Sequence, residues 1–222
     1  MKLKRVLAAS LMLGMATVWA AEPMTTREEL RAAFEARGNA ARGGRLFDDC
    51  KACHGRSGGG NAEGGIPVIA QQHQRVIVKQ LVDYRHAERW DLQMEEVAAR
   101  HRLGPPQDLA DLAAFISTLQ RGPSTGVGDG RQLAAGAQAY ARDCSGCHGP
   151  EGEGNGVTLV PRLAGQHYRY LLRQLHDTLE ERRPNMPPPH IQLLSPYGVD
   201  ELTGVADYLS RLKPSRRVLP DR

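Results

Sequence analysis

Cysteine is scarce in this sequence. Only four of the 222 residues are cysteines, and all four fall within two short motifs of the pattern Cys-x-x-Cys-His. No thiol remains for a structural disulfide, a separate zinc site or a cysteine nucleophile. Sustained strand-like alternation of apolar and polar residues is also missing, which favours an all-α fold. Beyond the N-terminus, no segment approaches the run of about 18 apolar residues that a membrane helix needs.

The N-terminus has the pattern of a secretory signal peptide. Three basic residues among the first five precede the apolar run 6–19, which is too short to span a bilayer comfortably. We expect cleavage after Ala20, which would remove residues 1–20. The mature protein is then expected in the bacterial periplasm, with no transmembrane segment. An uncleaved membrane anchor is the less favoured alternative.

The overall charge gives no argument for a nucleic-acid partner. The chain has 29 Lys and Arg residues against 25 Asp and Glu residues, a formal net charge of +4. Three of the basic residues belong to the expected signal peptide, so 26 remain against the same 25 acidic residues. A nearly balanced charge predicts no binding to nucleic acid.

The two Cys-x-x-Cys-His motifs carry the clearest functional signal. Two thiols three residues apart suit covalent attachment of one haem, and the adjacent histidine suits the proximal iron ligand. We therefore predict two covalently bound haem c groups. Zinc and thioredoxin-like interpretations are far less favoured, because a histidine follows each motif and the chain has an export signal. The predicted attachment and proximal residues are Cys50, Cys53 and His54, and then Cys144, Cys147 and His148.

The second half of the chain repeats the first at an offset of 94 positions. Both motifs match at this offset, and so do the pairs Pro67 with Pro161 and His73 with His167. A glycine-rich stretch between the repeats predicts a linker. The expected organisation is a first domain at 25–121, a linker at 122–130, a second domain at 131–213 and a tail at 214–222.

Each repeat has the same expected helices. A short helix precedes each motif, a second helix follows its glycine-rich loop, and the last helix has apolar residues at helical spacing. A glycine one turn into the first helix, Gly43 or Gly136, predicts a close crossing by the last helix. The first helices are expected at 42–49 and 133–143, and the last at 109–119 and 202–212.

The distal ligand decides whether a haem iron passes electrons or binds exogenous molecules. Only three methionines follow the expected cleavage site: Met24, Met94 and Met186. The separation of Met94 from His54 along the chain nearly equals that of Met186 from His148. One methionine per haem at nearly matched spacing predicts Met94 and Met186 as the distal ligands. A methionine that fills a gap in the core is the alternative.

Other histidines are weaker candidates for the distal position. His73 and His167 follow their proximal histidines closely and at equal spacing, and we expect them at helix starts or on the domain surface. His190 lies four residues after Met186, behind three prolines. It is the most credible rival ligand for the second haem.

The surroundings of the haems can also be predicted in part. Pro67 and Pro161 follow their proximal histidines at the same spacing, so a backbone carbonyl at each could accept the Nδ1–H of that histidine. Ordinary loop prolines are the alternative. Arg75 and Arg169 are in register and could pair with haem propionates, or else lie on solvated helix faces. Trp90 is expected in the core.

These residues resemble cytochrome c4, the periplasmic di-haem cytochromes built from two class I cytochrome c domains. The resemblance rests on both motifs, on the stretch 161–166 (Pro-Arg-Leu-Ala-Gly-Gln) before a helix, and on 80–84 (Gln-Leu-Val-Asp-Tyr) followed by Met94. It implies two tandem all-α domains related by a pseudo-twofold, each wrapped around one haem. Family members often carry paired methionines at the ligand position, whereas this chain has Gln93-Met94 and Met186-Pro187.

The resemblance implies an electron carrier rather than an enzyme. The implied partners are a quinol-oxidising cytochrome complex and a terminal oxidase or reductase. The alternative is the electron-transfer subunit of a periplasmic dehydrogenase, with a flavin or sulfur-oxidising partner. A di-haem enzyme such as a peroxidase or thiosulfate dehydrogenase is less favoured, because both predicted distal positions are filled and no cysteine is spare. Peripheral association with a membrane stays open.

Overall fold

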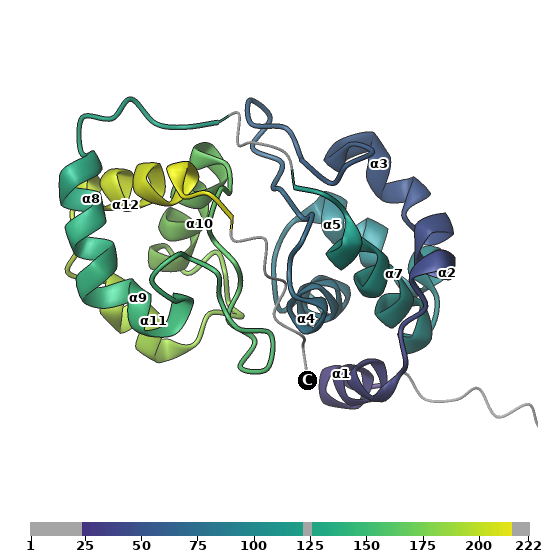
Figure 1. Cartoon of the computed structure of the whole chain (residues 1–222). Helices are drawn as coiled ribbons and strands as arrows, with labels where there is room; N and C mark the ends of the chain where they lie inside the picture. The colour runs from purple at the N-terminus through teal and green to yellow at the C-terminus, as the bar shows by residue number, and fades with distance from the viewer. Residues whose placement is uncertain (1–23, 122–125, 215–222) are drawn as a thin grey trace, which may run out of the picture.

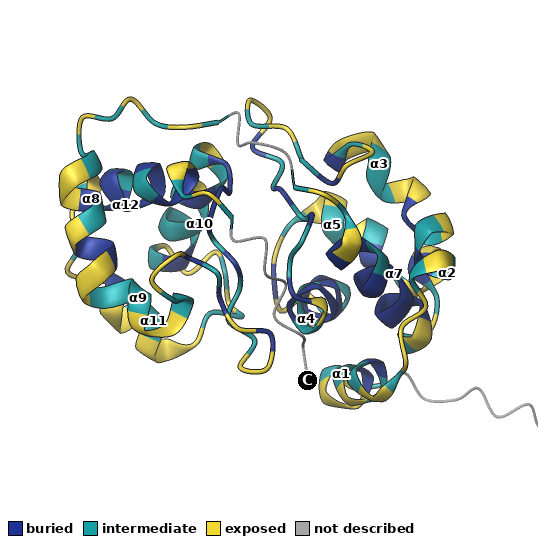
Figure 2. Ribbon diagram, viewed as in Figure 1, coloured by how far each residue is buried: buried dark blue, intermediate teal, exposed yellow. Residues whose placement is uncertain are grey.

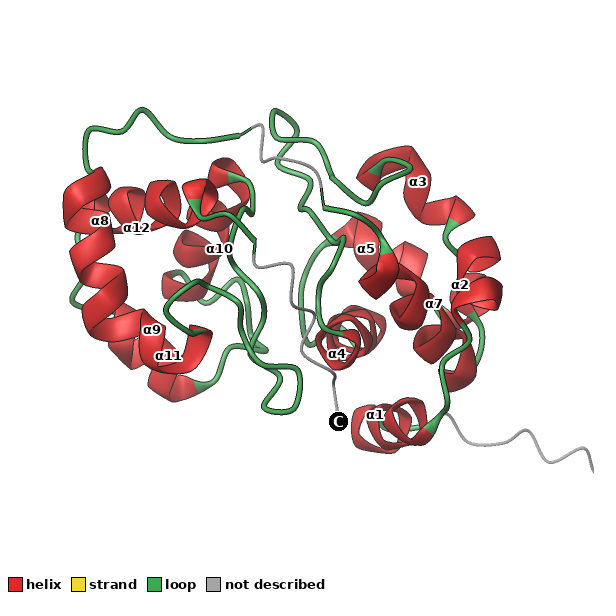
Figure 3. Ribbon diagram, viewed as in Figure 1, coloured by secondary structure: helices red, strands yellow, loops and turns green. Residues whose placement is uncertain are grey.

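The computed structural model describes residues 24–121 and 126–214 (Figure 1). The expected signal peptide at 1–20, part of the linker and most of the tail lie outside the described residues. Within them the chain forms helices and loops but no strand, apart from two isolated bridges, Asn61 with Ile66 and Asn155 with Val160 (Figure 3). The all-α prediction is confirmed. No described helix is long and apolar enough to cross a membrane.

The described helices form two lobes, one from each half of the chain (Figure 1). The first lobe contains α1 (Thr26–Glu35), α2 (Ala40–Leu46), α3 (Asp48–His54), α4 (Gln74–Arg85), α5 (Leu92–Ala98), α6 (Arg100–Leu103) and α7 (Pro106–Thr118). The second contains α8 (Leu133–Ala139), the π-helix η1 (Tyr140–Cys144), α9 (Ser145–His148), α10 (Tyr168–Leu179), α11 (Pro188–Leu194) and α12 (Val199–Arg211).

The last helix of each half lies at the centre of its lobe. In the first lobe α7 packs against α2, α4 and α1, and in the second α12 packs against α8 and α10. Buried residues gather on α4, α7 and α12 (Figure 2). Apolar spacing places these faces inward, and their burial stabilises each lobe.

Glycine makes the close helix crossings possible. An ideal Cβ on Gly43 of α2 would lie 1.9 Å from the carbonyl oxygen of Asp111 on α7. An ideal Cβ on Gly136 of α8 would lie 2.0 Å from the carbonyl oxygen of Gly204 on α12. A side chain of any size would clash with the facing backbone, so the crossing predicted from these glycines is confirmed.

Helix α1 is docked on the first lobe. It begins at a capping box between Thr25 and Glu28 and packs against α4 and α7. Its Glu29 is fully buried, accepts a hydrogen bond from Arg85, and lies 2.7 Å from the Nε2 atom of His86. This buried ion pair ties α1 to the end of α4.

Two glutamines join the lobes through a repeated pair of hydrogen bonds. The Oε1 atom of Gln166 accepts from the amide of Val68 at 2.8 Å, and its Nε2 donates to the carbonyl of Val68 at 2.8 Å. Gln72 makes the same two contacts with Arg162, at 2.9 and 3.1 Å. Both partners are related by the repeat offset, so the interface is isologous about a pseudo-twofold.

Two histidines repeat this symmetry. The Nε2 atom of His73 donates to the carbonyl of Glu153 at 2.8 Å, and that of His167 donates to the carbonyl of Gly59 at 2.8 Å. Both histidines directly precede a helix, as expected, but they are buried between the lobes rather than on a domain surface. Each histidine is covered by a polar loop of the other lobe. The sequence of one domain does not reveal this contact with the other domain.

Candidate functional site

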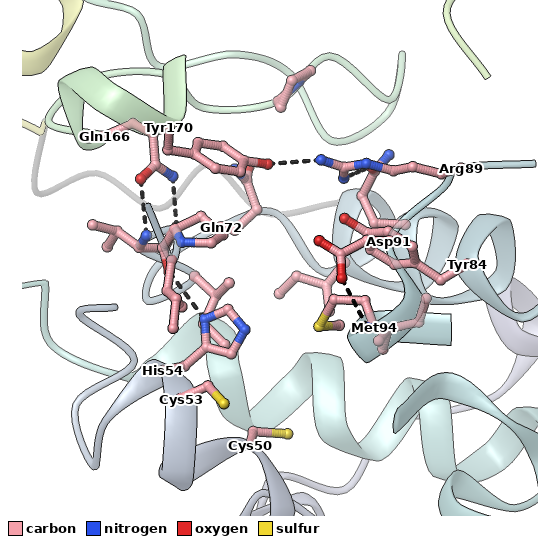
Figure 4. A pocket seen from close by; sticks show the side chains of 18 of the residues that line it. Cys50, Cys53, His54, Gln72, Tyr84, Arg89, Asp91, Met94, Gln166 and Tyr170 are labelled. Carbon is pink, nitrogen blue, oxygen red and sulfur yellow. Dashed lines mark hydrogen bonds between the residues drawn. The ribbon is translucent and has the colours of Figure 1, made fainter. Parts of the chain in front are cut away.

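The first Cys-x-x-Cys-His motif forms one wall of an apolar cavity of about 290 Å³. Helix α3 carries Cys50 and Cys53 on one face, because residues three apart lie side by side on a helix, and it ends at the buried His54. Met94 on α5 lies across the cavity from His54 (Figure 4). The structure thus brings together all four residues predicted for the first haem.

Local capping positions Met94. The side chain of Asp91 caps α5 and accepts a hydrogen bond from the backbone amide of Met94 at 3.1 Å. Met94 is partly buried and packs against the hydrophobic core of the lobe. Its thioether is therefore held on the cavity wall by the first turn of a capped helix.

Both proximal histidines are oriented in the same way. The Nδ1 atom of His54 donates to the carbonyl of Pro67 at 3.0 Å, and that of His148 donates to the carbonyl of Pro161 at 3.1 Å. A carbonyl only accepts, so Nδ1 carries the proton and Nε2 keeps its lone pair for a metal. Burial lowers the pKa of both histidines, which favours the neutral ligand form, although these hydrogen bonds oppose the shift. The predicted role of the two proline carbonyls is confirmed.

The second motif lines a smaller cavity of about 80 Å³. Cys144 ends the π-helix η1, and Cys147 and His148 follow on α9. Across this cavity lies His190 of α11, whose ring centroid is 6.4 Å from that of His148. Met186 is half-buried in the loop before α11 and is not among the residues that line the cavity.

The first thiol of each motif has a raised pKa, which favours its neutral form. Burial, together with neighbouring Asp49, raises the pKa of Cys50 to about 12. Burial and Asp143 raise the pKa of Cys144 to about 11. Such thiols differ from the activated thiolates of thioredoxin-like sites. Within residues 24–121 and 126–214 no cluster of three or more His, Cys, Asp or Glu side chains offers a zinc site.

Arginines line the first cavity. Arg89 and Arg162 are almost fully buried there, and Arg183 lies beside Arg89. Burial, reinforced by Arg89, lowers the pKa of Arg183 to about 10. Several guanidinium groups beside an apolar cavity suit an anionic ligand, because guanidinium groups bind carboxylates through charge-assisted hydrogen bonds. A haem is an apolar ring with two carboxylates, so the cavity fits this group.

These arginines are not the ones that the sequence suggested. The guanidinium of Arg75 lies over the ring of Phe34, 4.3 Å from its centroid. Arg169 is exposed and lies 3.6 Å from a carboxylate oxygen of Glu63. Trp90 is 59% exposed rather than in the core. A signal for the observed arginines was present, since Arg89 and Arg183 are also related by the repeat offset.

The two cavities adjoin at the interface between the lobes. Leu163 lines both of them, and the first cavity also receives Tyr170 and Gln174 from α10 of the second lobe. Figure 4 shows Tyr170 and Gln166 at the edge of the first cavity, where the hydroxyl of Tyr170 accepts a hydrogen bond from Arg89.

The fold and the two attachment motifs define a class of protein. The cytochrome c family model matches residues 40–120 and 133–213, each with one Cys-x-x-Cys-His site. The chain is a two-domain cytochrome c with two covalently bound haem c groups. Cytochrome c4 from Azotobacter vinelandii is 35% identical over 164 residues, which cover 68% of this chain and 77% of that protein. The chain belongs to the cytochrome c4 family.

Solved structures and a second relative agree with this assignment. The crystal structure of reduced recombinant cytochrome c4 from Pseudomonas stutzeri matches with a TM-score of 0.71 and 28% identity, covering 79% of this chain and 100% of that chain. A thiosulfate dehydrogenase electron acceptor from Stutzerimonas stutzeri (strain A1501) is 30% identical over 176 residues, 73% of this chain and 78% of that protein. The protein is a di-haem electron carrier and not an enzyme.

Proposed function

We propose that this cytochrome carries electrons in the periplasm, between a quinol-oxidising cytochrome complex and a terminal oxidase or reductase. The observation that carries the proposal is the meeting of the two cavities at Leu163, each cavity with its own attachment motif. Adjacent sites favour electron passage within the molecule, so one haem can accept while the other donates. The export signal at 1–20 supports the periplasmic location.

In this proposal the residues of each site have distinct roles. The four cysteines (Cys50, Cys53, Cys144 and Cys147) attach the haems, and His54 and His148 are the proximal ligands. Met94 is the distal ligand of the first haem. For the second haem the sequence spacing favours Met186, whereas the cavity lining favours His190.

Haem supplies a one-electron iron couple, and the protein tunes it. The carbonyls of Pro67 and Pro161 fix the proximal rings and increase their basicity. Apolar walls keep water from the site, and buried arginines such as Arg89 balance the carboxylates of the cofactor. A site with both axial positions filled reorganises little, which suits electron transfer.

We also propose domain boundaries at 25–121 and 131–213, with a linker at 122–130 and a tail at 214–222. Support comes from the family matches at 40–120 and 133–213 and from helix α1, which packs on the first lobe. The second domain is supported by the packing of α8 against α12 near its two ends.

The test is reduction of the purified holoprotein by a quinol in the presence of a purified quinol-oxidising complex, followed by oxidation with a terminal oxidase. We expect both haems to be reduced only when the complex is present, and reoxidised when the oxidase is added. A Met94→Leu variant should retain covalent haem but should exchange electrons with its redox partners more slowly. If dithionite reduces both haems but the quinol-oxidising complex does not, the proposed donor is wrong.

A second candidate function is supported by the thiosulfate dehydrogenase electron acceptor relative. It is also supported by a thiosulfate dehydrogenase structure from Marichromatium purpuratum, whose match covers 81% of this chain but 44% of that chain, with a TM-score of 0.68. The protein would then accept electrons from a dehydrogenase of that kind. Thiosulfate-dependent reduction in the presence of such an enzyme, faster than reduction by the quinol-oxidising complex, would favour this donor.

A further inference from the structure

A turn of the second lobe is held by the first lobe. The Nδ2 atom of Asn185 donates a hydrogen bond to the Oδ2 atom of Asp83, on α4, at 2.6 Å. Asp83 is fully buried, and its Oδ2 atom also accepts from Lys79, one turn earlier on α4. Its Oδ1 atom has no hydrogen-bond partner among the described residues. A hydrogen bond to a carboxylate is stronger than one between neutral groups, so this contact anchors the loop before α11.

The segment 183–186 closes around this contact. The Nε atom of Arg183 donates to the Oδ1 atom of Asn185 at 3.3 Å, so both polar atoms of that side-chain amide are bonded. The backbone amide of Met186 donates to the carbonyl of Arg183 at 3.1 Å. The side chain of Arg183 lines the first cavity, where it lies beside Arg89. The turn therefore contacts the first lobe at two points, although its sequence belongs to the second.

Met94, the proposed distal ligand of the first haem, is held from within its own lobe. Asp91 caps α5 and accepts a hydrogen bond from the backbone amide of Met94. Helix α11 begins differently, because its N-cap is Pro187, which makes no side-chain cap hydrogen bond. Three prolines follow Met186, and a proline has no amide to donate. The first turn of α11 therefore gives Met186 no support like that which α5 gives Met94.

The register of the last helices places Met186 level with Met94. Helices α7 and α12 both have 13 residues, and they begin at Pro106 and Val199, an offset of 93 positions. At that offset Met186 falls next to Met94. The fold therefore supports Met186 as the distal residue of the second lobe, as the sequence spacing does. The two lobes differ in how this residue is held.

We propose that Asn185 positions Met186 for the second haem, through its hydrogen bond to Asp83 of the first lobe. The inference rests on the proposed role of Met186 as the distal ligand. The distal bond of the second haem then depends on the contact between the lobes, whereas that of the first haem depends on a cap within its own lobe. Because a thioether ligand raises the reduction potential, loss of the contact lowers the potential of the second haem and leaves Met94 bound.

The physical reason is the conformational freedom of the loop. Residues 180–187 connect α10 to α11 without a helix of their own. A loop without an anchor has many conformations, and only those that keep Met186 in place allow it to bind iron. One hydrogen bond to a buried charged group shifts this balance by about tenfold or more.

The test exchanges the two bonded groups. Asn185→Asp places a second carboxylate against Asp83, so the turn should detach. The double variant Asp83→Asn with Asn185→Asp restores a bond between an amide and a carboxylate and keeps the net charge of the wild type. Hydrogen exchange of the backbone amide of Met186 in the holoprotein should become about tenfold faster or more in Asn185→Asp. It should return to near the wild-type rate in the double variant.

Ligation is measured separately, by titration of the ferric holoprotein with imidazole. Asn185→Asp should bind imidazole at one haem of the two about tenfold more tightly than the wild type does. This binding should remove half of the weak long-wavelength band of the thioether–iron bond. Met186→Leu identifies the haem, since it should lose the same half of the band. The double variant should again resemble the wild type.

Two variants serve as controls. Arg169→Met removes another contact between the lobes, a hydrogen bond to the carbonyl of Glu63 at 3.4 Å, and should leave both measurements unchanged. Asp91→Ala should weaken the hold on Met94 and let imidazole bind the other haem.

Asn185→Ala removes the anchor without adding a charge, so it decides the question if Asn185→Asp does not fold. Wild-type exchange rates and wild-type imidazole affinity in the Asn185 variants would overturn the inference. A double variant that behaves like Asn185→Asp would overturn it as well.

The proposed function fails in a different way. If Met186→Leu keeps the full band, Met186 is not the distal ligand, and the inference falls with it. If Met186→Leu halves the band but the Asn185 variants behave like the wild type, the ligand stands and only the anchor is rejected. Failure of a quinol-oxidising complex to reduce the protein would reject the proposed partner and leave both the ligand and the anchor in place.

Discussion

Arg89 joins the charge of the first cavity to the second lobe. Its guanidinium donates to Gln80 of its own lobe, and to the hydroxyl of Tyr170 at 2.8 Å and the side chain of Gln174 across the interface. These hydrogen-bond partners are neutral, and the carboxylate of Asp83 compensates part of the positive charge of Arg89. A fixed positive charge near the iron favours the reduced state, which carries one positive charge less.

We therefore predict that Arg89→Met lowers the potential of the first haem by tens of millivolts, on the order expected for one charge at an effective dielectric near 20. Spectroelectrochemical titration of the holoprotein measures this shift. The matched control is Arg169→Met, since the side chain of Arg169 is 64% exposed and screened by water. Equal shifts in both variants would mean that overall charge, rather than the buried guanidinium, sets the potential.

At the residue scale the sequence reveals the sites of covalent attachment but not the charged neighbours of the first cavity. A motif identifies Cys144 and His148 because attachment depends on local sequence. The matched register of Arg75 and Arg169 points to these two arginines, but the arginines that line the first cavity include Arg89 instead. Arg89 is buried where the two lobes meet, and a single repeat does not contain that contact.

Helix crossings depend on single glycines at the scale of the element. Gly136→Ala in α8 would place a methyl group about 2.0 Å from the carbonyl oxygen of Gly204, so α12 must move away. We expect a loss of about 1–3 kcal/mol of unfolding free energy, the usual cost of overpacking. Urea denaturation of the holoprotein measures it. Gly146→Ala, also in a helix, meets nothing within 4 Å and should be neutral or stabilising.

The docking of α1 depends on one buried carboxylate. Glu29→Gln leaves the guanidinium of Arg85 in the same buried place without its ion-pair partner. Removal of one member of a buried pair typically costs about 3–5 kcal/mol, so α1 should detach before the rest of the lobe unfolds. Hydrogen exchange of the α1 amides reports this directly. The exposed Glu35→Gln at the end of α1 is the control, and equal exchange in both variants would show that apolar contacts alone hold the helix.

Periodicity predicts some elements and misses others for clear reasons. The helices α7 and α12 are the longest in their lobes, so their apolar faces repeat often enough to be recognised. The helices α5 and α11 have seven residues each, fewer than two full turns, so an apolar repeat along them is too short to recognise. Half of the ten residues of helix α1 are charged, and its inward face includes the buried Glu29, which a hydrophobic pattern does not detect.

At the scale of the whole molecule, residues related by the sequence repeat form the interface between the two lobes. Gln72 and Gln166 occupy the same position in the two repeats. The side chain of each hydrogen-bonds to the backbone amide and carbonyl of one residue in the other lobe. The two contacts therefore form together, and both adjoin the first cavity. Polar bonds between loops of the two lobes therefore help to fix the relative placement of the two cavities.

We accordingly predict that the double variant Gln72→Ala with Gln166→Ala loosens the lobes without unfolding either. Each substitution leaves a buried amide and carbonyl without partners, at Val68 or Arg162, and each such group costs about 1–3 kcal/mol. Calorimetry of the holoprotein should then resolve two unfolding transitions where the wild type has one. Gln107→Ala, whose side chain bonds only within the first lobe, should keep the single transition. If the double variant also unfolds in one step at the wild-type temperature, then contacts other than these glutamines couple the lobes.

The rate of electron exchange between the two haems tests whether this interface matters for function. Pulse reduction measures that rate. The rate should fall in the double variant only if the two lobes separate.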